Sequence, residues 1–185
     1  NFKTTKSVWI KEGNEPKKGH GITCEDSKYL EWLLELKNKG FEIGYHNTTY
    51  SSSLREDINE GLKKFNMIFK QKPKAMANHS VNKENIYWGA HRLSGLRKIL
   101  YNILTGFKKN RFYEGQDESS QYFWGDICRD NITYVRNFVF SDINTLKKCP
   151  YMPYRDKSKP YVNYWFASSE GNNVEKFNKC ISQKN

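Results

Sequence analysis

The stretch FEIGYH, residues 41–46, decides the fold, because it reads as a short apolar strand that ends at a histidine. Segments with a three- to four-residue apolar period flank it on both sides, over residues 26–39 and 54–69. Two more strand-like runs, SVWI at residues 7–10 and KAMANH at residues 74–79, complete a β-α-β-α-β order. Such units pack as parallel strands with right-handed crossovers, so the sequence predicts an α/β fold.

Boundary signals support these elements. Gly40 follows the first helical segment at the position of a C′ glycine, and Pro73 ends the second segment. The run SLRE, residues 53–56, has the spacing of a capping box, which predicts that the second helix begins there. The second half of the chain is less regular, and we expect there a helix at residues 93–107, strands at residues 133–140 and 160–167, and a last helix capped by Asn172 or Asn173.

The length of 185 residues fits one domain, and we expect a single domain over residues 1–185. The chain shows no internal repeat and no linker. It has no starting Met, and the last helical pattern is still running at Asn185. We therefore expect that the domain is truncated at both ends.

The chain is strongly basic, with 31 Lys and Arg against 20 Asp and Glu and a net charge of +11. Such a charge favours anionic partners, and a basic module that binds polyanions is one alternative. No RNA-recognition, zinc-finger or helix-turn-helix motif accompanies the charge, so nucleic acid is not the expected partner. No apolar run is long enough for a membrane span and no signal peptide is visible, which predicts a cytoplasmic protein. The sequence leaves the oligomeric state open.

The cysteines are spaced widely and form no Cys-x-x-Cys pair, which argues against a structural zinc cluster. A domain of this length does not need disulfides to fold. We expect free thiols in a reducing compartment, and disulfide bonds are the alternative. The four residues are Cys24, Cys128, Cys149 and Cys180.

Two histidines each end a predicted strand. His46 closes the strand at residues 41–46, and His79 closes the next strand along the chain. Since parallel strands point their carboxyl ends to one edge of the sheet, the two imidazoles should meet on the same rim. Such a pair suits a divalent metal, most simply zinc. The alternative is that both are polar loop residues that merely follow strands.

Further polar and aromatic residues fall near the same rim. Asp142 and Glu170 follow two later strands and could position a substrate or act as acid and base, although Asp142 could equally be a helix cap. Aromatic rings stack on the apolar faces of sugars, and carboxylates accept hydrogen bonds from sugar hydroxyls. The candidate substrate-binding residues are Tyr50, Trp88, His91, Trp124, Asp126 and Trp165.

At these residues the chain resembles a known family. The stretch at residues 41–46 is similar to the second motif of the polysaccharide deacetylases, the NodB-homology group, in which a strand ends at a metal-binding His. The stretch ANHS at residues 77–80 is similar to the later His-bearing segment of an atypical branch. The runs VFSD at residues 139–142 and WFASSEG at residues 165–171 also resemble that branch, and the likeness covers roughly residues 2–185.

This resemblance implies a partial or distorted (β/α) barrel of the deacetylase type that binds a divalent metal, usually zinc. It implies hydrolysis of N- or O-acetyl groups on a carbohydrate substrate, with His46 and His79 as metal ligands. In the family the metal polarises the acetyl carbonyl and lowers the pKa of its bound water. A carboxylate acts as the base and a His commonly acts as the acid.

The chain departs from the family pattern in three places. The acidic first motif should precede residues 7–10, where only six residues are present. Tyr50 stands where the second motif normally has another His, and the final His motif would lie beyond Asn185. Either the chain is a fragment or the reaction has been lost. A catalytically inactive carbohydrate-binding or scaffold domain of the same fold is therefore the main alternative to the enzyme.

Overall fold

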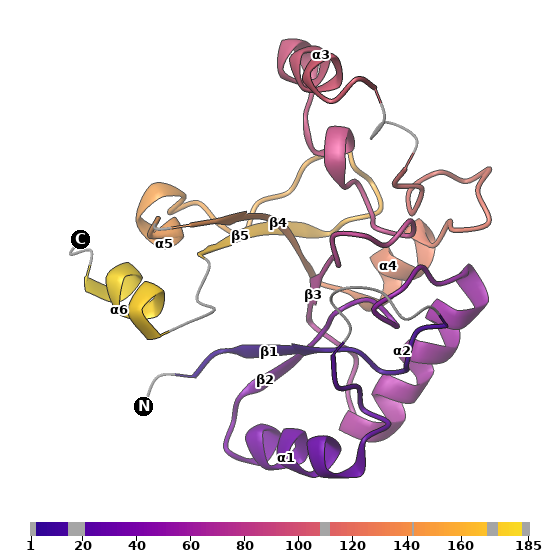
Figure 1. Ribbon diagram of the computed structural model, residues 1–185, viewed down its shortest axis with the longest axis vertical. Helices are drawn as coiled ribbons and strands as arrows, with labels where there is room; N and C mark the ends of the chain where they lie inside the picture. Colours follow the sequence, from indigo (N-terminus) through magenta and orange to yellow (C-terminus); the bar gives the residue numbers. More distant parts are fainter. Residues whose placement is uncertain (1–2, 15–20, 108–111, 142, 170–173, 183–185) are drawn as a thin grey trace.

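The computed structural model describes residues 3–14, 21–107, 112–141, 143–169 and 174–182. Its strands form a five-stranded, all-parallel sheet in the order β1-β2-β3-β4-β5, so neighbours in sequence are neighbours in space (Figure 1). The strands are β1 (Thr5–Val8), β2 (Glu42–Tyr45), β3 (Ala75–Ala77), β4 (Tyr134–Phe140) and β5 (Tyr164–Ser169). The predicted α/β class is confirmed.

Helices connect each strand to the next, and the β3–β4 connection is the longest of these links. Its described residues form one 3-10 helix and two α-helices, and α3 stands apart from the sheet at one end of the molecule (Figure 1). The helices are α1 (Ser27–Asn38), α2 (Arg55–Phe69), η1 (Gly89–Arg92), α3 (Gly95–Leu104), α4 (Gly125–Asn131), α5 (Thr145–Lys148) and α6 (Val174–Ser182).

Helix α2 begins one residue later than the predicted capping box. Its N-cap is Leu54, whose N–H donates to the Asp57 carboxylate at 3.1 Å. The predicted cap, Ser53, instead donates its own N–H to the buried carboxylate of Glu84 at 3.2 Å. The predicted capping box was therefore wrong by one residue. The tertiary hydrogen bond of Ser53 to Glu84 takes the place of the local capping contact that the sequence predicted.

Other boundaries differ from the sequence expectation as well. Helix α4 was not expected, since its sequence GDICRDN is short and rich in residues that favour turns. Helix α3 is shorter at both ends than residues 93–107, and β5 starts four residues later than the predicted strand at residues 160–167. The predicted elements at residues 26–39 and 133–140 match α1 and β4 closely.

One row of side chains crosses the sheet and organises the core. The row joins register partners on adjacent strands: Val8, Tyr45, Met76, Val135 and Trp165. Each of these side chains is at most 1% exposed, and all belong to one hydrophobic cluster. Since side chains alternate along a strand, the residue after each of them points to the opposite face of the sheet.

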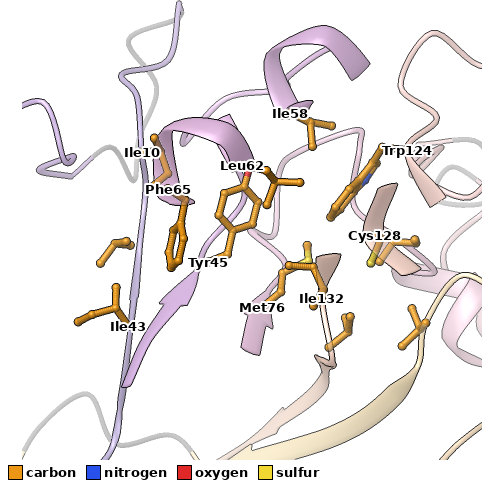
Figure 2. Packing of buried hydrophobic residues seen from close by; sticks show 14 of the residues in the cluster. Ile10, Ile43, Tyr45, Ile58, Leu62, Phe65, Met76, Trp124, Cys128 and Ile132 are labelled. Carbon is orange, nitrogen blue, oxygen red and sulfur yellow. The ribbon is translucent and has the colours of Figure 1, made fainter. Parts of the chain in front are cut away.

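Helix α2 covers this row with its own apolar stripe. Figure 2 shows Phe65 and Leu62 of the stripe next to Tyr45, and the Phe65 and Tyr45 rings meet edge-on with centroids 6.2 Å apart. Ile58 and Phe69 extend the stripe in both directions and are also buried. The spacing of these residues at three- and four-residue steps is what predicted the helix.

The described thiols form no disulfide. Cys24, Cys128 and Cys149 are free, as expected for a domain of this length, and the side chain of Cys180 lies outside the described part. Burial raises the pKa of Cys24 to about 12, so its thiol stays protonated at neutral pH. In the described ranges no helix combines the length and apolarity that a bilayer crossing needs.

Truncating a side chain of α2 that covers the core row should destabilise the fold strongly. Phe65 is fully buried, so Phe65→Ala should lower the free energy of unfolding by about 3–5 kcal/mol, measured by urea denaturation. The control is Met67→Ala on the same helix, whose side chain is 64% exposed. That change should stay within about 0.5 kcal/mol, and equal losses at the two positions would contradict the packing described here.

Candidate functional site

The structure brings His46 and His79 together at the carboxyl ends of β2 and β3. Their ring centroids lie 5.4 Å apart with planes at 58°. Trp9 contacts both rings, with centroid distances of 4.8 Å to His46 and 5.3 Å to His79. The two imidazoles and the indole therefore form one cluster at the rim, as the strand positions of the histidines led us to expect.

The register of the sheet explains why His46 and Trp9 lie on the same face. His46 follows Tyr45 of the core row, and its N–H donates to the Val8 carbonyl at 3.0 Å. It therefore faces away from the core, on the same side as Trp9, which follows Val8. Arg136 follows Val135 in the same way, and the Arg136 charge contributes to the lowered pKa of His46.

His46 is anchored through one nitrogen only. Its Nδ1 lies 3.2 Å from the Ser7 hydroxyl on β1, and its Nε2 is buried without a hydrogen-bond partner among the described residues. Metal-binding histidines usually hydrogen-bond through one ring nitrogen to a carboxylate, a backbone carbonyl or water and bind the metal through the other, and in His46 the Ser7 hydroxyl takes the place of the first partner.

His79 has a similar anchor. Its Nδ1 lies 3.1 Å from Oδ1 of Asn82. The Asn82 amide nitrogen donates to the carbonyls of Thr49 and Ser51 and to the Glu84 carboxylate, at 3.0, 2.8 and 2.7 Å. These bonds fix the orientation of the amide, so Oδ1 accepts and Nδ1 of His79 carries the proton. In the neutral ring the lone pair is then at Nε2.

The site holds His46 in its neutral form. Burial is the main cause that lowers the pKa of His46 to about 3, and the electrostatic influence of His79, Arg136 and Lys6 contributes to the same shift. Neutral imidazole is the form that binds metal ions, so His46 needs no proton removed near pH 7.

A buried amide network holds the two strand-end loops together. Asn47, in the left-handed region with φ of 53°, accepts the His79 N–H at 2.9 Å and donates to the Glu84 carboxylate at 2.9 Å. Glu84 also accepts from Asn82 and from the Ser53 N–H. The Asn85 side-chain nitrogen donates to the His79 carbonyl, and the Asn85 side-chain oxygen accepts a hydrogen bond from Asn47. The position of His79 relative to His46 is therefore set by these polar contacts.

This buried amide network was not expected from the sequence. Burial raises the pKa of Glu84 to about 7, while the hydrogen bonds from Asn47 and Asn82 oppose the shift. The available signal was the density of Asn, Ser and Thr directly after two strands, over residues 47–53 and 78–85. Short polar loops of this kind can fold inward when their groups satisfy one another.

Of three further predicted site residues, Tyr50 contacts the histidine cluster through Trp9. Tyr50 meets Trp9 edge-on with centroids 6.2 Å apart, and its hydroxyl donates to the Gly13 carbonyl at 3.3 Å. Trp88 is half-buried and carries the Arg92 guanidinium over its ring at 4.3 Å. His91 lies in η1 and is half-exposed.

Three predicted residues are engaged elsewhere. Trp124 and Trp165 are each 1% exposed and belong to the hydrophobic core, and the Trp124 indole donates to the Glu84 carbonyl at 2.6 Å. Asp126 forms a two-pronged ion pair with Arg55 at 2.6 and 2.7 Å. The structure therefore places both indoles in the core, and it pairs the partly exposed carboxylate of Asp126 with Arg55. Asp142 and Glu170 lie outside the described residues.

Within the described ranges, no group of three or more His, Cys, Asp and Glu side chains is arranged to hold a metal ion. The histidine pair thus supplies two candidate ligands, and its role as a metal site stays a prediction. Comparisons with protein-family models, with curated proteins and with solved structures found no match. The chemistry of the site must therefore be inferred from its own residues.

The pH dependence of stability tests whether His46 is held neutral. The pKa of His46 falls from 6.5 in the unfolded chain to about 3 in the fold, so on acidification the unfolded state takes up the proton first. This contribution to stability is complete above pH 6.5 and is lost as the pH falls toward 3. Between pH 7 and pH 4 the unmodified chain should lose about 3 kcal/mol more than His46→Gln, measured by urea denaturation. Parallel pH profiles would contradict a buried neutral imidazole.

Glu84 should shift stability in the opposite direction. Its pKa rises from 4.5 to about 7 on folding, so the folded state holds the proton longer as the pH rises. The free energy of unfolding should therefore fall between pH 4.5 and pH 7, by about 3 kcal/mol at most, and Glu84→Gln should lack this fall. The control is Glu31→Gln, which removes the same charge from an exposed position on α1. Measuring each variant against the unmodified chain separates this effect from that of His46, and an unchanged slope in Glu84→Gln would argue against it.

Proposed function

We propose that this chain is a metal-dependent hydrolase that removes acetyl groups from a carbohydrate. The observation that supports it is the histidine pair, in which both rings hydrogen-bond within the protein through Nδ1 and keep Nε2 for another partner. The proposal also draws on the motif order, which is similar to that of the polysaccharide deacetylases around residues 41–46 and 77–80.

The spacing of the two rings suits one shared zinc ion. With Zn–N bonds near 2.0–2.1 Å and tetrahedral angles, two imidazoles bound through Nε2 have centroids about 5 Å apart. The observed separation of 5.4 Å is close to that value. When bound, the metal would polarise an acetyl carbonyl and lower the pKa of a water molecule. Asp142 and Glu170 remain the proposed acid and base groups.

The residues of this chain have separate tasks in the proposed site. His46 and His79 hold the metal, while Ser7 and Asn82 fix the orientation of the two rings. Trp9 packs against both imidazoles. Together with Tyr50, Trp9 also offers aromatic surface on which a sugar ring could stack.

We further propose that the sheet is part of a distorted (β/α) barrel. Parallel strands in strictly sequential order are what barrel winding requires, whereas a doubly wound sheet reverses its strand order at a switch point. In this arrangement the face that carries His46 and Arg136 would be the inside of the barrel.

A second candidate is a carbohydrate-binding domain of the same fold without catalysis. The observation that favours it is Tyr50, which takes the position of a further family His and is engaged with Trp9 and the Gly13 carbonyl. This candidate keeps the aromatic surface and needs no base.

Metal analysis tests the proposal. The purified chain, loaded with zinc and dialysed, should retain about one zinc ion per chain, and His46→Ala and His79→Ala should each lower metal affinity by at least tenfold. The control is His91→Ala, which removes an imidazole from η1 and should leave the zinc content unchanged. Near-ultraviolet circular dichroism would verify that each variant is folded.

Acetate release then separates the two candidates. Zinc-loaded chain should release acetate from N- or O-acetylated oligosaccharides, and the release should fall at least a hundredfold in the two ligand variants. Glycan binding with no release by the unmodified chain would select the binding domain. Unchanged zinc content in both His variants would remove the metal hypothesis.

A further inference from the structure

Helix α3 carries its apolar stripe on the outside. The exposed fractions of its apolar side chains run from 55% at Ile99 to 84% at Leu96, and Phe107 just beyond the helix is 60% exposed. Their spacing of three and four residues puts them on one face of the helix. The stripe comprises Leu96, Ile99, Leu100, Ile103, Leu104 and Phe107.

The polar side of the same helix faces the protein. Asn102 is only 8% exposed, while Lys98, Tyr101 and Thr105 are half-buried. A helix on the surface of a soluble domain normally has the reverse orientation, with its apolar side inward. Scattered exposed apolar side chains need no explanation, but six of them in one continuous stripe mark a docking surface.

The stretch of sequence that contains α3 is basic. No acidic residue occurs between Glu84 and Glu114, and Arg97 borders the apolar stripe by its position one residue after Leu96. The whole chain carries a net charge of +11. The stripe is therefore complementary to a surface that combines apolar material with negative charge.

We infer that α3 docks on an anionic lipid surface as an interfacial helix, with its leucines and isoleucines among the acyl chains and Arg97 at the headgroups. An apolar stripe bordered by basic side chains is the pattern of such helices. With ten residues, α3 is too short to cross a bilayer. Figure 1 shows α3 at one end of the molecule, apart from the sheet.

Two other occupants fit the observations less well. A second copy of the chain would bring another net charge of +11 against the same basic region. Nucleic acid would bind the basic side chains through its phosphates, but that contact gives no reason for six exposed apolar side chains. A lipid surface uses both the charge and the stripe.

Vesicle flotation tests the inference. The unmodified chain should float with vesicles of phosphatidylcholine mixed with phosphatidylglycerol and should bind phosphatidylcholine vesicles at least tenfold more weakly. The variant Leu100→Asp/Leu104→Asp should reduce binding to the anionic vesicles by at least tenfold, because both side chains leave water on docking. Arg97→Gln should reduce it by a few-fold, and added salt should weaken the binding of the unmodified chain.

A matched control has the same charge change elsewhere. Leu146→Asp/Met67→Asp alters two side chains that are 76% and 64% exposed, much like Leu104 at 76% and Leu100 at 59%. This control should bind the anionic vesicles nearly as well as the unmodified chain does. An equal loss of vesicle binding in both double variants would mean that the added negative charge alone weakens binding, and it would overturn the inference. Failure of the unmodified chain to float with anionic vesicles would overturn it too. The inference would also be overturned if the unmodified chain were a dimer in solution and only the α3 double variant were a monomer, because the stripe would then be a contact between two copies.

Discussion

The in-register row of buried side chains across the parallel sheet is the constraint on which the rest depends. Val8, Tyr45 and Met76 align because parallel pairing fixes their register, and α2 covers them with a continuous apolar stripe. A shift of one residue in any strand would turn its core side chain to the other face. The packing of the row therefore also decides which side chains appear on that other face.

The candidate site is the direct product of that alternation. Trp9 and His46 each follow a member of the row, and they meet on the opposite side of the sheet at its carboxyl edge. The strands alone do not place His79, which lies two residues beyond β3. Its position is set by Asn47 and Asn82, so the geometry of the pair depends on a polar network as much as on the hydrophobic core.

The sequence predicted those parts of the fold in which apolar residues recur at a regular spacing. The three- and four-residue stripe of α2 and the strand ends at His46 and His79 led correctly to parallel pairing and to two adjacent imidazoles. It could not assign Trp124 and Trp165, because an aromatic residue has the same appearance in a core and on a sugar-binding surface. Glu84 was missed for the converse reason: an acid is expected at the surface, and only tertiary amide partners make its burial tolerable.

The outward stripe of α3 has a consequence for how that helix stays ordered. An isolated helix of about ten residues is marginal in water, and most helices in proteins gain their stability from packing an apolar side against the core. Helix α3 buries little besides Asn102, so tertiary packing contributes little to it. Whatever covers its leucines would also supply the missing stabilisation, and the winding of this segment and its attachment would then be a single thermodynamically linked event.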